Sequence, residues 1–269
     1  MPSFTTSSTR LFTQLAMCML LLLSRATGFA QESVRISPAS VYLHDGRQSL
    51  QVTFTSASTQ TAALHLSVIY GFDGMTPAAT DTPESSRQAK SCAAWVRCQP
   101  SALELERGQS ATVEITAAPP AGLKDGEYWG RVIVRNGEGG STVERPVVAE
   151  IPLAYRKGDT YADVQLAGTK IIRDGETVRL NFELQQLGNS AYHGNLALVV
   201  RNAKGKELFK EKMPISVYET GSKRFDIPGK TMPPGVYKAT LNFDAERPDL
   251  GDAALLVLPK NYTVEFRLP

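Results

Sequence analysis

The sequence predicts an all-β protein: two tandem immunoglobulin-like β-sandwiches that follow a cleavable signal peptide. Three observations lead to this prediction: apolar and polar residues alternate along most of the chain, turn residues recur at short intervals, and one short sequence motif occurs twice in similar form. Alternation with a period of two is the pattern of a strand that buries one face. Many short strands separated by regular turns are typical of β-sandwiches.

The amino terminus has the pattern of a secretory signal peptide. The run LAMCMLLLL, from Leu15 to Leu23, is apolar and too short to span a bilayer. The stretch ATGFA then places Gly28 and Ala30 at the small-residue positions before a cleavage site. We therefore expect residues 1–30 to be removed and the mature protein to be exported, with no membrane span in the mature chain. The alternative is a membrane anchor that stays attached.

Two cysteines, Cys92 and Cys98, remain after cleavage, with five residues between them in SCAAWVRCQP. In an oxidising compartment an even pair of this kind predicts a disulfide bond. Closing so short a loop would stabilise the fold by about 2 kcal/mol, because the unfolded chain loses entropy. A metal site is a poorer interpretation, since two thiolates need further ligands and no histidine lies nearby in the sequence.

Period-two alternation in the first half defines a first domain, residues 31–156. The stretches SLQVTFTS (49–56) and TAALHLSVIY (61–70) each carry apolar residues at alternate positions. Two short strands are expected around the turn at Arg107–Gly108, and NGEGG (136–140) has hairpin chemistry between two longer strands. No stretch before Ala154 shows a sustained helical period.

The second half shows the same period-two alternation and defines a second domain, residues 160–269. The stretch TVRLNFELQQ (177–186) alternates, NLALVVRNAKGKELFKEK (195–212) predicts two strands around a turn, and NYTVEFRL (261–268) closes the chain. The boundary is expected near Tyr155–Asp163, where the alternation stops and lysine, glycine and aspartate cluster.

The repeated motif is Gly-x-Tyr, and each copy stands at the start of a predicted strand. LKDGEYWGRVIV contains Gly126 and Tyr128, and MPPGVYKATLNF contains Gly235 and Tyr237. We interpret both copies as the same late strand of a sandwich, in which the glycine permits a turn conformation. The tyrosine hydroxyl would bond back to that turn as in a tyrosine corner. Coincidence is the alternative, since Gly-x-Tyr before a strand is common in β proteins.

No residue pattern favours a catalytic or cofactor site. The histidines His44, His65 and His193 are expected in a turn, on the outward face of a strand and in a loop, with no nucleophile motif beside them. Metalloprotease, nucleophile-elbow and phosphate-loop motifs do not occur, and DGE at 125–127 and 174–176 is assigned to turns. We therefore expect no enzyme activity, no cofactor and no metal. The formal net charge of +2 also indicates no nucleic-acid partner.

The stretch TVERPVVAEIPLAYR is the best candidate for a binding element. Proline cannot donate a hydrogen bond to a sheet, so Pro146 and Pro152 suggest an exposed edge strand. An exposed edge with an apolar face is a template for a partner's strand. The alternative is that the apolar face is the core of this domain and that the prolines prevent unwanted pairing. The residues that share the apolar face are Val143, Val147, Ala149, Ile151, Leu153 and Tyr155.

Several stretches resemble the first domain of the periplasmic pilus chaperones, the PapD-like family: VRISPASVYLHDGRQSLQVTFTSAS, QPSALELERGQSATVEI, DGEYWGRVIV and IPLAYR. The resemblance covers much of Val34 to Arg156. The family typically ends its first domain with I-x-L-x-Y-R-P. Here Ile151, Leu153, Tyr155 and Arg156 match the motif, and Lys157 replaces its proline. The second half resembles a generic bacterial immunoglobulin-like domain.

The resemblance implies that the last strand of the first domain lends its apolar face to a pilus subunit that lacks a strand. It also implies that two basic residues in the interdomain cleft hold the terminal carboxylate of that subunit. The chain departs from the family here, because the alignment places Ser40 and Pro152 where the family has arginine and lysine. The cations that are candidates to replace this pair are Arg35, Arg145, Arg156 and Lys157.

We therefore expect a periplasmic, chaperone-like protein that binds a protein partner, first of all a pilus subunit, by β-strand addition along the last strand of the first domain. The expected partner-binding residues are Val147, Ala149, Ile151, Leu153, Arg156 and Lys157. The alternative is a non-enzymatic envelope or cell-surface scaffold, or an adhesion protein, that binds partners through its loops.

Overall fold

The computed structural model describes the chain except for residues 1–33, 59–60, 73–88, 138–145, 248–254 and 256. The predicted signal peptide therefore lies outside the described residues, as do Val143, Arg145 and most of the predicted NGEGG turn. Within the described ranges, no helix is long and apolar enough to cross a membrane.

The first half of the chain folds into two packed sheets. One sheet has the strand order β1 (Val34–Ser37), β3 (Ser49–Ser56), β7 (Ser110–Ala117) and β5 (Val96–Gln99). The other has the order β2 (Val41–His44), β9 (Val147–Lys157), β8 (Gly126–Asn136), β4 (Ala62–Ile69) and β6 (Ala102–Leu105). All pairs in these sheets are antiparallel except β2 with β9, which is parallel.

The second half also folds into two sheets. The first has the order β10 (Val164–Asp174), β11 (Thr177–Gln186) and β14 (Thr220–Pro228). The other has the order β13 (Glu207–Val217), β12 (Tyr192–Asn202), β15 (Gly235–Asp244) and β16 (Lys260–Leu268). A short 3-10 turn, η2 (Gly229–Thr231), connects β14 to β15. The predicted all-β fold of two immunoglobulin-like sandwiches is confirmed.

The predicted alternation sets which side chains enter each core. One apolar core takes its buried residues from Val34 to Tyr155, and a separate core takes them from Ala162 to Leu268. Alternate positions of β3 and β11 are buried, as a sheet with one face in the core requires. The buried apolar members of these two strands are Val52, Phe54, Val178, Leu180, Phe182 and Leu184.

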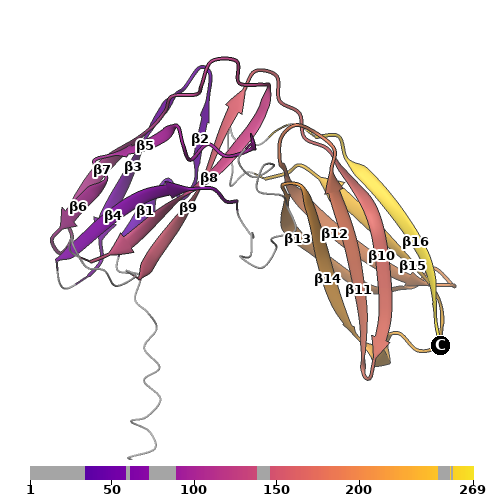
Figure 1. The fold of residues 1–269 in the computed structure, drawn as a ribbon. Helices are drawn as coiled ribbons and strands as arrows, with labels where there is room; N and C mark the ends of the chain where they lie inside the picture. The colour runs from indigo at the N-terminus through magenta and orange to yellow at the C-terminus, as the bar shows by residue number, and fades with distance from the viewer. Residues whose placement is uncertain (1–33, 59–60, 73–88, 138–145, 248–254, 256) are drawn as a thin grey trace, which may run out of the picture.

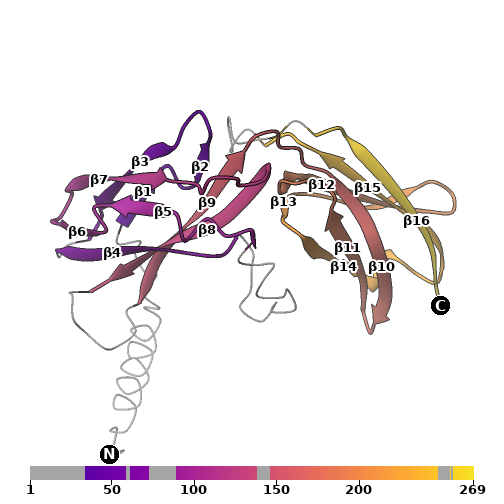
Figure 2. The same ribbon diagram turned by 45° about the horizontal axis from the view of Figure 1, so that its top comes forward.

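The two sandwiches sit at an angle to one another. In Figure 1, β9 rises through the first sandwich to the top of the view and β10 descends through the second, so that the two strands form the arms of an inverted V. Figure 2 shows the same bend after rotation, with β2 lying beside the upper end of β9. The chain therefore turns between the sandwiches at the end of β9.

The two copies of the repeated Gly-x-Tyr motif form a pair of tyrosine corners. The Tyr128 hydroxyl donates to the carbonyl oxygen of Lys124 at 2.9 Å, and the Tyr237 hydroxyl donates to the carbonyl oxygen of Pro233. Each tyrosine thus bonds to the residue four positions before it. Each is also the third residue of its strand, β8 or β15, and each strand lies inside its sheet. The prediction that the two Gly-x-Tyr motifs mark equivalent strands of the two sandwiches is confirmed.

The predicted disulfide is wrong, because Cys92 and Cys98 are free thiols. Cys92 donates its backbone N–H to Trp129 of β8, and its sulfur lies so close to Gly130 that a Cβ there would come within 2.9 Å. Cys98 belongs to β5 and pairs with Ile115 of β7 in the same sheet, which is not the sheet that contains β8. The backbones of the two cysteines therefore bond to different sheets of the sandwich. Burial raises the pKa of Cys92 to about 12 and that of Cys98 to about 11, so both stay protonated near neutral pH.

The tyrosine corners give a first testable expectation. Replacing Tyr128 or Tyr237 by phenylalanine should lower the free energy of unfolding by about 1 kcal/mol each, because a partly buried hydrogen bond is lost and its carbonyl acceptor loses that donor. Urea unfolding followed by circular dichroism measures this. Tyr161→Phe is the matched control, since that ring is 60% exposed, and it should leave stability unchanged. Equal stability of all three variants would contradict the structural role of the corners.

Candidate functional site

The candidate binding strand β9 is paired differently along its length. It runs antiparallel to β8 over most of its length, from Val147 opposite Arg135 to Lys157 opposite Gly126. On its other side, β2 pairs in parallel with Leu153–Arg156. In the part of the chain that the structure describes, no strand pairs with that side of Val147–Pro152. Half of β9 is therefore an inner strand and half is a sheet edge.

The exposure of β9 changes in step with its pairing. Val147 is 44% exposed and Ala149 is half-buried, whereas Ile151 and Leu153 are only 1% and 3% exposed and belong to the first core. The outward face also carries an exposed Val148, 36% exposed. The structure thus brings the predicted apolar face together, but only its first residues lie at the surface.

The position of Pro152 is consistent with this division. Pro152 lies opposite Arg131 of β8 and immediately before the segment that β2 covers. Because proline has no N–H, it fits in a strand where its nitrogen faces an unpaired edge. Successive residues of a strand direct their backbone groups to opposite sides, so the N–H of Glu150, two residues earlier, faces the same edge.

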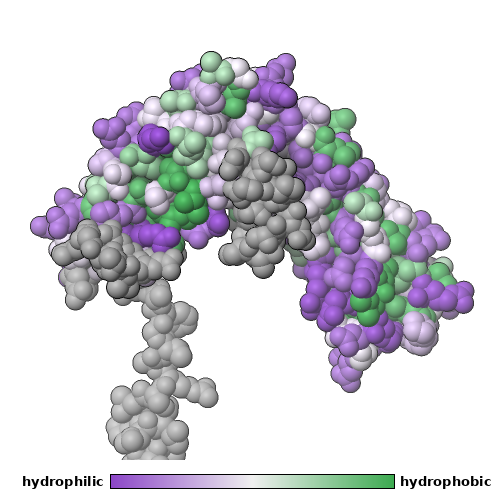
Figure 3. All heavy atoms as spheres, viewed as in Figure 1, coloured by the Kyte–Doolittle hydropathy of each residue, from purple (hydrophilic) through white to green (hydrophobic). Residues whose placement is uncertain are grey.

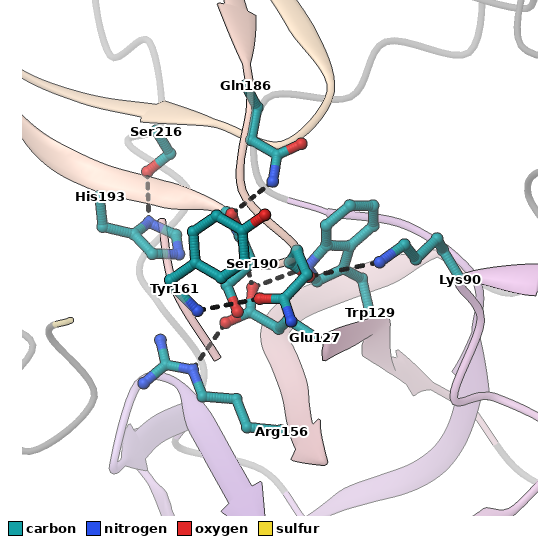
Figure 4. A network of polar contacts seen from close by, with 11 residues as sticks. Lys90, Glu127, Trp129, Arg156, Tyr161, Gln186, Ser190, His193 and Ser216 are labelled. Atoms are coloured by element: carbon teal, nitrogen blue, oxygen red, sulfur yellow. Dashed lines mark hydrogen bonds and ion pairs between the residues drawn. The ribbon is translucent and has the colours of Figure 1, made fainter. Parts of the chain in front are cut away.

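The charged end of β9 contacts a buried carboxylate. Arg156 Nε donates to Glu127 Oε2 at 2.7 Å, and the Glu127 side chain is 0% exposed. The other carboxylate oxygen accepts from Trp129 Nε1 at 2.7 Å and from the backbone N–H of Ala191 at 3.3 Å. Figure 4 shows the side chains of Trp129 and Arg156 beside Glu127. Since Ala191 belongs to the second sandwich, this carboxylate joins the two sandwiches.

A second polar link across the interface centres on Asn189, which precedes β12. Its carbonyl oxygen accepts from the backbone N–H of Glu127 at 2.9 Å and from Lys90 Nζ at 3.3 Å. Lys90 lies over the rings of Tyr128 and Trp129, with Nζ 5.7 and 5.5 Å from their centroids. Burial lowers the pKa of this lysine. Lys90 therefore carries a partly desolvated cation at the junction of the sandwiches.

Glycine is required where the two sandwiches meet most closely. Gly126 has φ +144°, and a Cβ at this position would lie 3.0 Å from the carbonyl oxygen of Asn189. Residues with side chains rarely adopt this conformation, and the approach of the second backbone leaves no room for one. Gly126, the glycine of the first Gly-x-Tyr motif, thus permits both the turn before β8 and the close contact between the two domains.

An aromatic cluster fills the apolar part of the interface. Phe72 stacks on Tyr218 with ring centroids 4.5 Å apart, and Trp129 meets Tyr218 edge-on at 5.4 Å. His193 also meets Tyr218 edge-on, at 5.5 Å. Trp129 and Tyr218 form a buried apolar cluster with Ala154 and Ala191, and two of its members bond to the Glu127 carboxylate, which is thereby kept away from water. Shielding of this kind strengthens the ion pair and makes an unpaired charge costly.

Two sequence-based assignments are corrected at this interface. Glu127 was expected in a turn, but it lies in β8 and is fully buried. His193 was expected in a loop, but it lies in β12, is 5% exposed and has Nδ1 2.9 Å from the Ser216 hydroxyl. Neither position carries a sequence signal for burial, because both side chains are polar and each is buried where groups of the two sandwiches meet.

The remaining candidate cation, Lys157, contacts the end of β2. Lys157 Nζ donates to Asp45 Oδ2 at 2.9 Å, the Gly158 N–H donates to the same oxygen at 3.0 Å, and the Tyr155 hydroxyl donates to Oδ1 at 2.7 Å. These bonds, with that from Lys157 the largest contribution, lower the pKa of Asp45 to about 2. Asp45 thus fastens the turn between the sandwiches to the first of them.

The positions that the PapD-like resemblance aligns with a basic pair are neighbours in the structure. Ser40 precedes Val41, which lies opposite Leu153, the residue after Pro152. Neither side chain carries charge. Of the cations considered as replacements, Arg156 and Lys157 are already engaged with carboxylates. No cluster of potential metal ligands occurs among the described residues.

The chain matches no known protein-family profile and no curated protein sequence. It is similar in structure to the CupB2 chaperone of Pseudomonas aeruginosa, with 12% identity, a TM-score of 0.40, and coverage of 87% of this chain and 100% of that one. It is also similar to the CsuC–CsuE chaperone–tip adhesion subunit complex from Csu pili of Acinetobacter baumannii, with 13% identity, a TM-score of 0.45, and coverage of 86% and 97%. The class 5 fimbriae chaperone CfaA gives 15% identity, a TM-score of 0.43, and coverage of 85% and 98%.

The buried ion pair gives a second expectation. Glu127→Ala should lower the free energy of unfolding by about 3–5 kcal/mol, because it leaves Arg156, whose side chain is 11% exposed, without its carboxylate. Glu150→Ala is the matched control, since its ion pair with Arg131 involves a carboxylate that is 44% exposed and should contribute less than about 1 kcal/mol. Chemical denaturation of both variants compares them. Similar losses in the two would mean that Glu127 has no special role.

The Asp45 contacts give an expectation for the pH dependence. A carboxyl group whose pKa is lower in the folded state stabilises the fold above its unfolded pKa of about 3.9, and that contribution is lost as the pH falls toward the folded value of about 2. Asp45→Asn should therefore be less stable than the parent protein at pH 7. The difference should shrink between about pH 4 and pH 2. Urea unfolding across this pH range measures it, with the exposed Glu104→Gln as control. A difference that stays constant down to pH 2 would contradict the Asp45 interaction.

Proposed function

We propose that this protein is an exported, periplasmic chaperone-like protein that binds a protein subunit by β-strand addition along the free edge of β9. The observation that carries the proposal is the unpaired side of Val147–Pro152, which belongs to a strand that is otherwise inside its sheet. A strand with one side unpaired offers backbone donors and acceptors that an extended peptide satisfies. The proposed partner is a pilus subunit, in agreement with the PapD-like stretches of the sequence.

The side chains around this edge suit an apolar partner strand. Val147 and Val148 are exposed, and Ala149 is half-buried on the face that leads to the core. On the opposite sheet, β1 is also an edge strand, and its Ile36 packs only partly against the same core. Figure 3 shows hydrophobic residues gathered on the face of the first sandwich in the region of β1 and β9. An added strand would place alternate apolar side chains over this opening.

The rest of β9 holds the edge in place in this proposal. Ile151 and Leu153 are core residues that fix the strand on the sandwich. Arg156 and Lys157 would have to leave Glu127 and Asp45 before binding a partner's carboxylate. We therefore assign Val147 and Ala149 to partner contact, and the other four predicted residues to the support of the strand.

The two domains have separate tasks under this proposal. The domain of residues 31–156 supplies the binding strand, and the domain of residues 160–269 holds the end of that strand through the contacts to Glu127. Rigid support matters because an edge that is already extended loses little conformational entropy when a partner strand pairs with it.

The test removes one backbone donor from the edge. Glu150→Pro deletes an N–H that faces the free side of β9 and leaves the bonds to β8 in place, so a subunit that pairs with this edge should no longer co-purify. Glu150→Ala is the matched control: it also loses the ion pair to Arg131 but keeps the N–H, so it should retain the subunit. Co-purification from periplasmic extracts, with circular dichroism of both variants, measures this.

The same comparison separates the proposal from its alternative. If Glu150→Pro is folded and retains its partner as well as Glu150→Ala does, strand addition along β9 is excluded. An envelope scaffold that binds through loops would give that result. Val147→Asp serves as a second variant, since its exposed side chain permits the change without disturbing the core, and it should also weaken the complex.

A further inference from the structure

A second candidate binding site lies at the far end of the second sandwich, away from β9. There the turn between β10 and β11 faces the connection between β14 and β15, at the lower tip of that sandwich in Figure 1. The two segments line an open cleft of about 770 Å³. Small-ligand and peptide sites commonly have volumes of about 300–1,000 Å³, so the cleft has room for a few residues of a peptide.

The walls of this cleft are held by bonds within the fold. The second tyrosine corner fixes one wall, because the Tyr237 hydroxyl bonds to the carbonyl of Pro233. The Gly229 N–H donates to the carbonyl of Glu176, which joins the two segments. A Cβ on Gly229 would lie 2.8 Å from that carbonyl oxygen, so the approach requires glycine. The cleft is therefore preformed, and a ligand would bind without the entropic cost of ordering it.

The charges around the cleft are unevenly paired. Arg173 lines it, is half-buried and donates to the carbonyl of Met232, and among the described residues no carboxylate forms an ion pair with it. Lys230 is exposed and makes no ion pair among the described residues. Asp226, by contrast, is already bound by Arg224 and Arg179. The rim carboxylate of Glu176 is the remaining acidic group of the lining.

We propose that this cleft binds an acidic segment of a protein chain. Arg173 and Lys230 would hold a carboxylate, which a guanidinium binds through charge-assisted hydrogen bonds. The rings of Pro228, Pro233 and Pro234 line the same cleft and offer apolar contact for the flanking part of the peptide. This apolar contact favours a peptide over a free anion. The site is independent of the proposed strand addition, because β9 belongs to the other sandwich.

The test uses the full purified protein and an acetylated, amidated pentapeptide that contains two glutamates. In amide NMR spectra this peptide should shift resonances of Gly175, Thr177 and Lys230, and the glutamine version of the peptide should not. Lys230→Glu should weaken the affinity roughly tenfold or more, the effect of losing a charge-assisted hydrogen bond. Lys204→Glu carries the same change of charge on the exposed turn between β12 and β13 and should have no effect.

A third variant should strengthen binding. Glu176→Gln removes the like charge from the rim and should raise the affinity roughly threefold at low salt. The proposal is overturned if the glutamine peptide binds as well, if Lys230→Glu and Lys204→Glu behave alike, or if no cleft resonance shifts. It is also overturned if inorganic phosphate produces the same shifts at the same concentration, because the cleft would then bind a free anion rather than a peptide.

Discussion

The relative placement of the two sandwiches depends on one buried carboxylate, Glu127. Burying a carboxylate away from water is costly unless donors replace the lost hydration. Here the donors come from both sandwiches: Trp129 and Arg156 from the first and the backbone of Ala191 from the second. Since moving the sandwiches apart would remove one donor and admit water, the carboxylate favours a single arrangement. The aromatic rings around Tyr218 add apolar area to the same contact.

This constraint explains how β9 combines a rigid strand with an open edge. Its last residues are paired on both sides and carry Arg156 into the interface. Its first residues are paired only with β8, and the core beneath them opens gradually from Ile151 to Val147. A segment fixed at one end in this way stays extended without a neighbour on its free side. An edge that is extended before binding is better suited to strand pairing than a mobile loop.

The sequence predicted much of the fold because alternation reports burial of one face directly. The faces of β3 and β11 were predicted in this way, and the two tyrosine corners were predicted from the repeated Gly-x-Tyr. The prediction of a disulfide between Cys92 and Cys98 was wrong because spacing in the sequence does not show to which sheet the backbone of each cysteine bonds. The burial of Glu127 was missed because a strand pattern shows how a side chain meets its own core and does not show what a second domain places against it.

By itself the sequence determined that each half would form a layered β unit and which side chains would fill its interior. The tertiary structure decided that β2 covers Leu153–Arg156 and leaves Val147–Pro152 open, that Arg156 is committed to Glu127, and that the far end of the second sandwich forms a cleft around Arg173. The physical reason is the distance along the chain between the residues that determine each feature. Alternation is set by neighbours along one strand, whereas an open edge, a buried ion pair and a cleft are set by segments that meet only after the chain has folded.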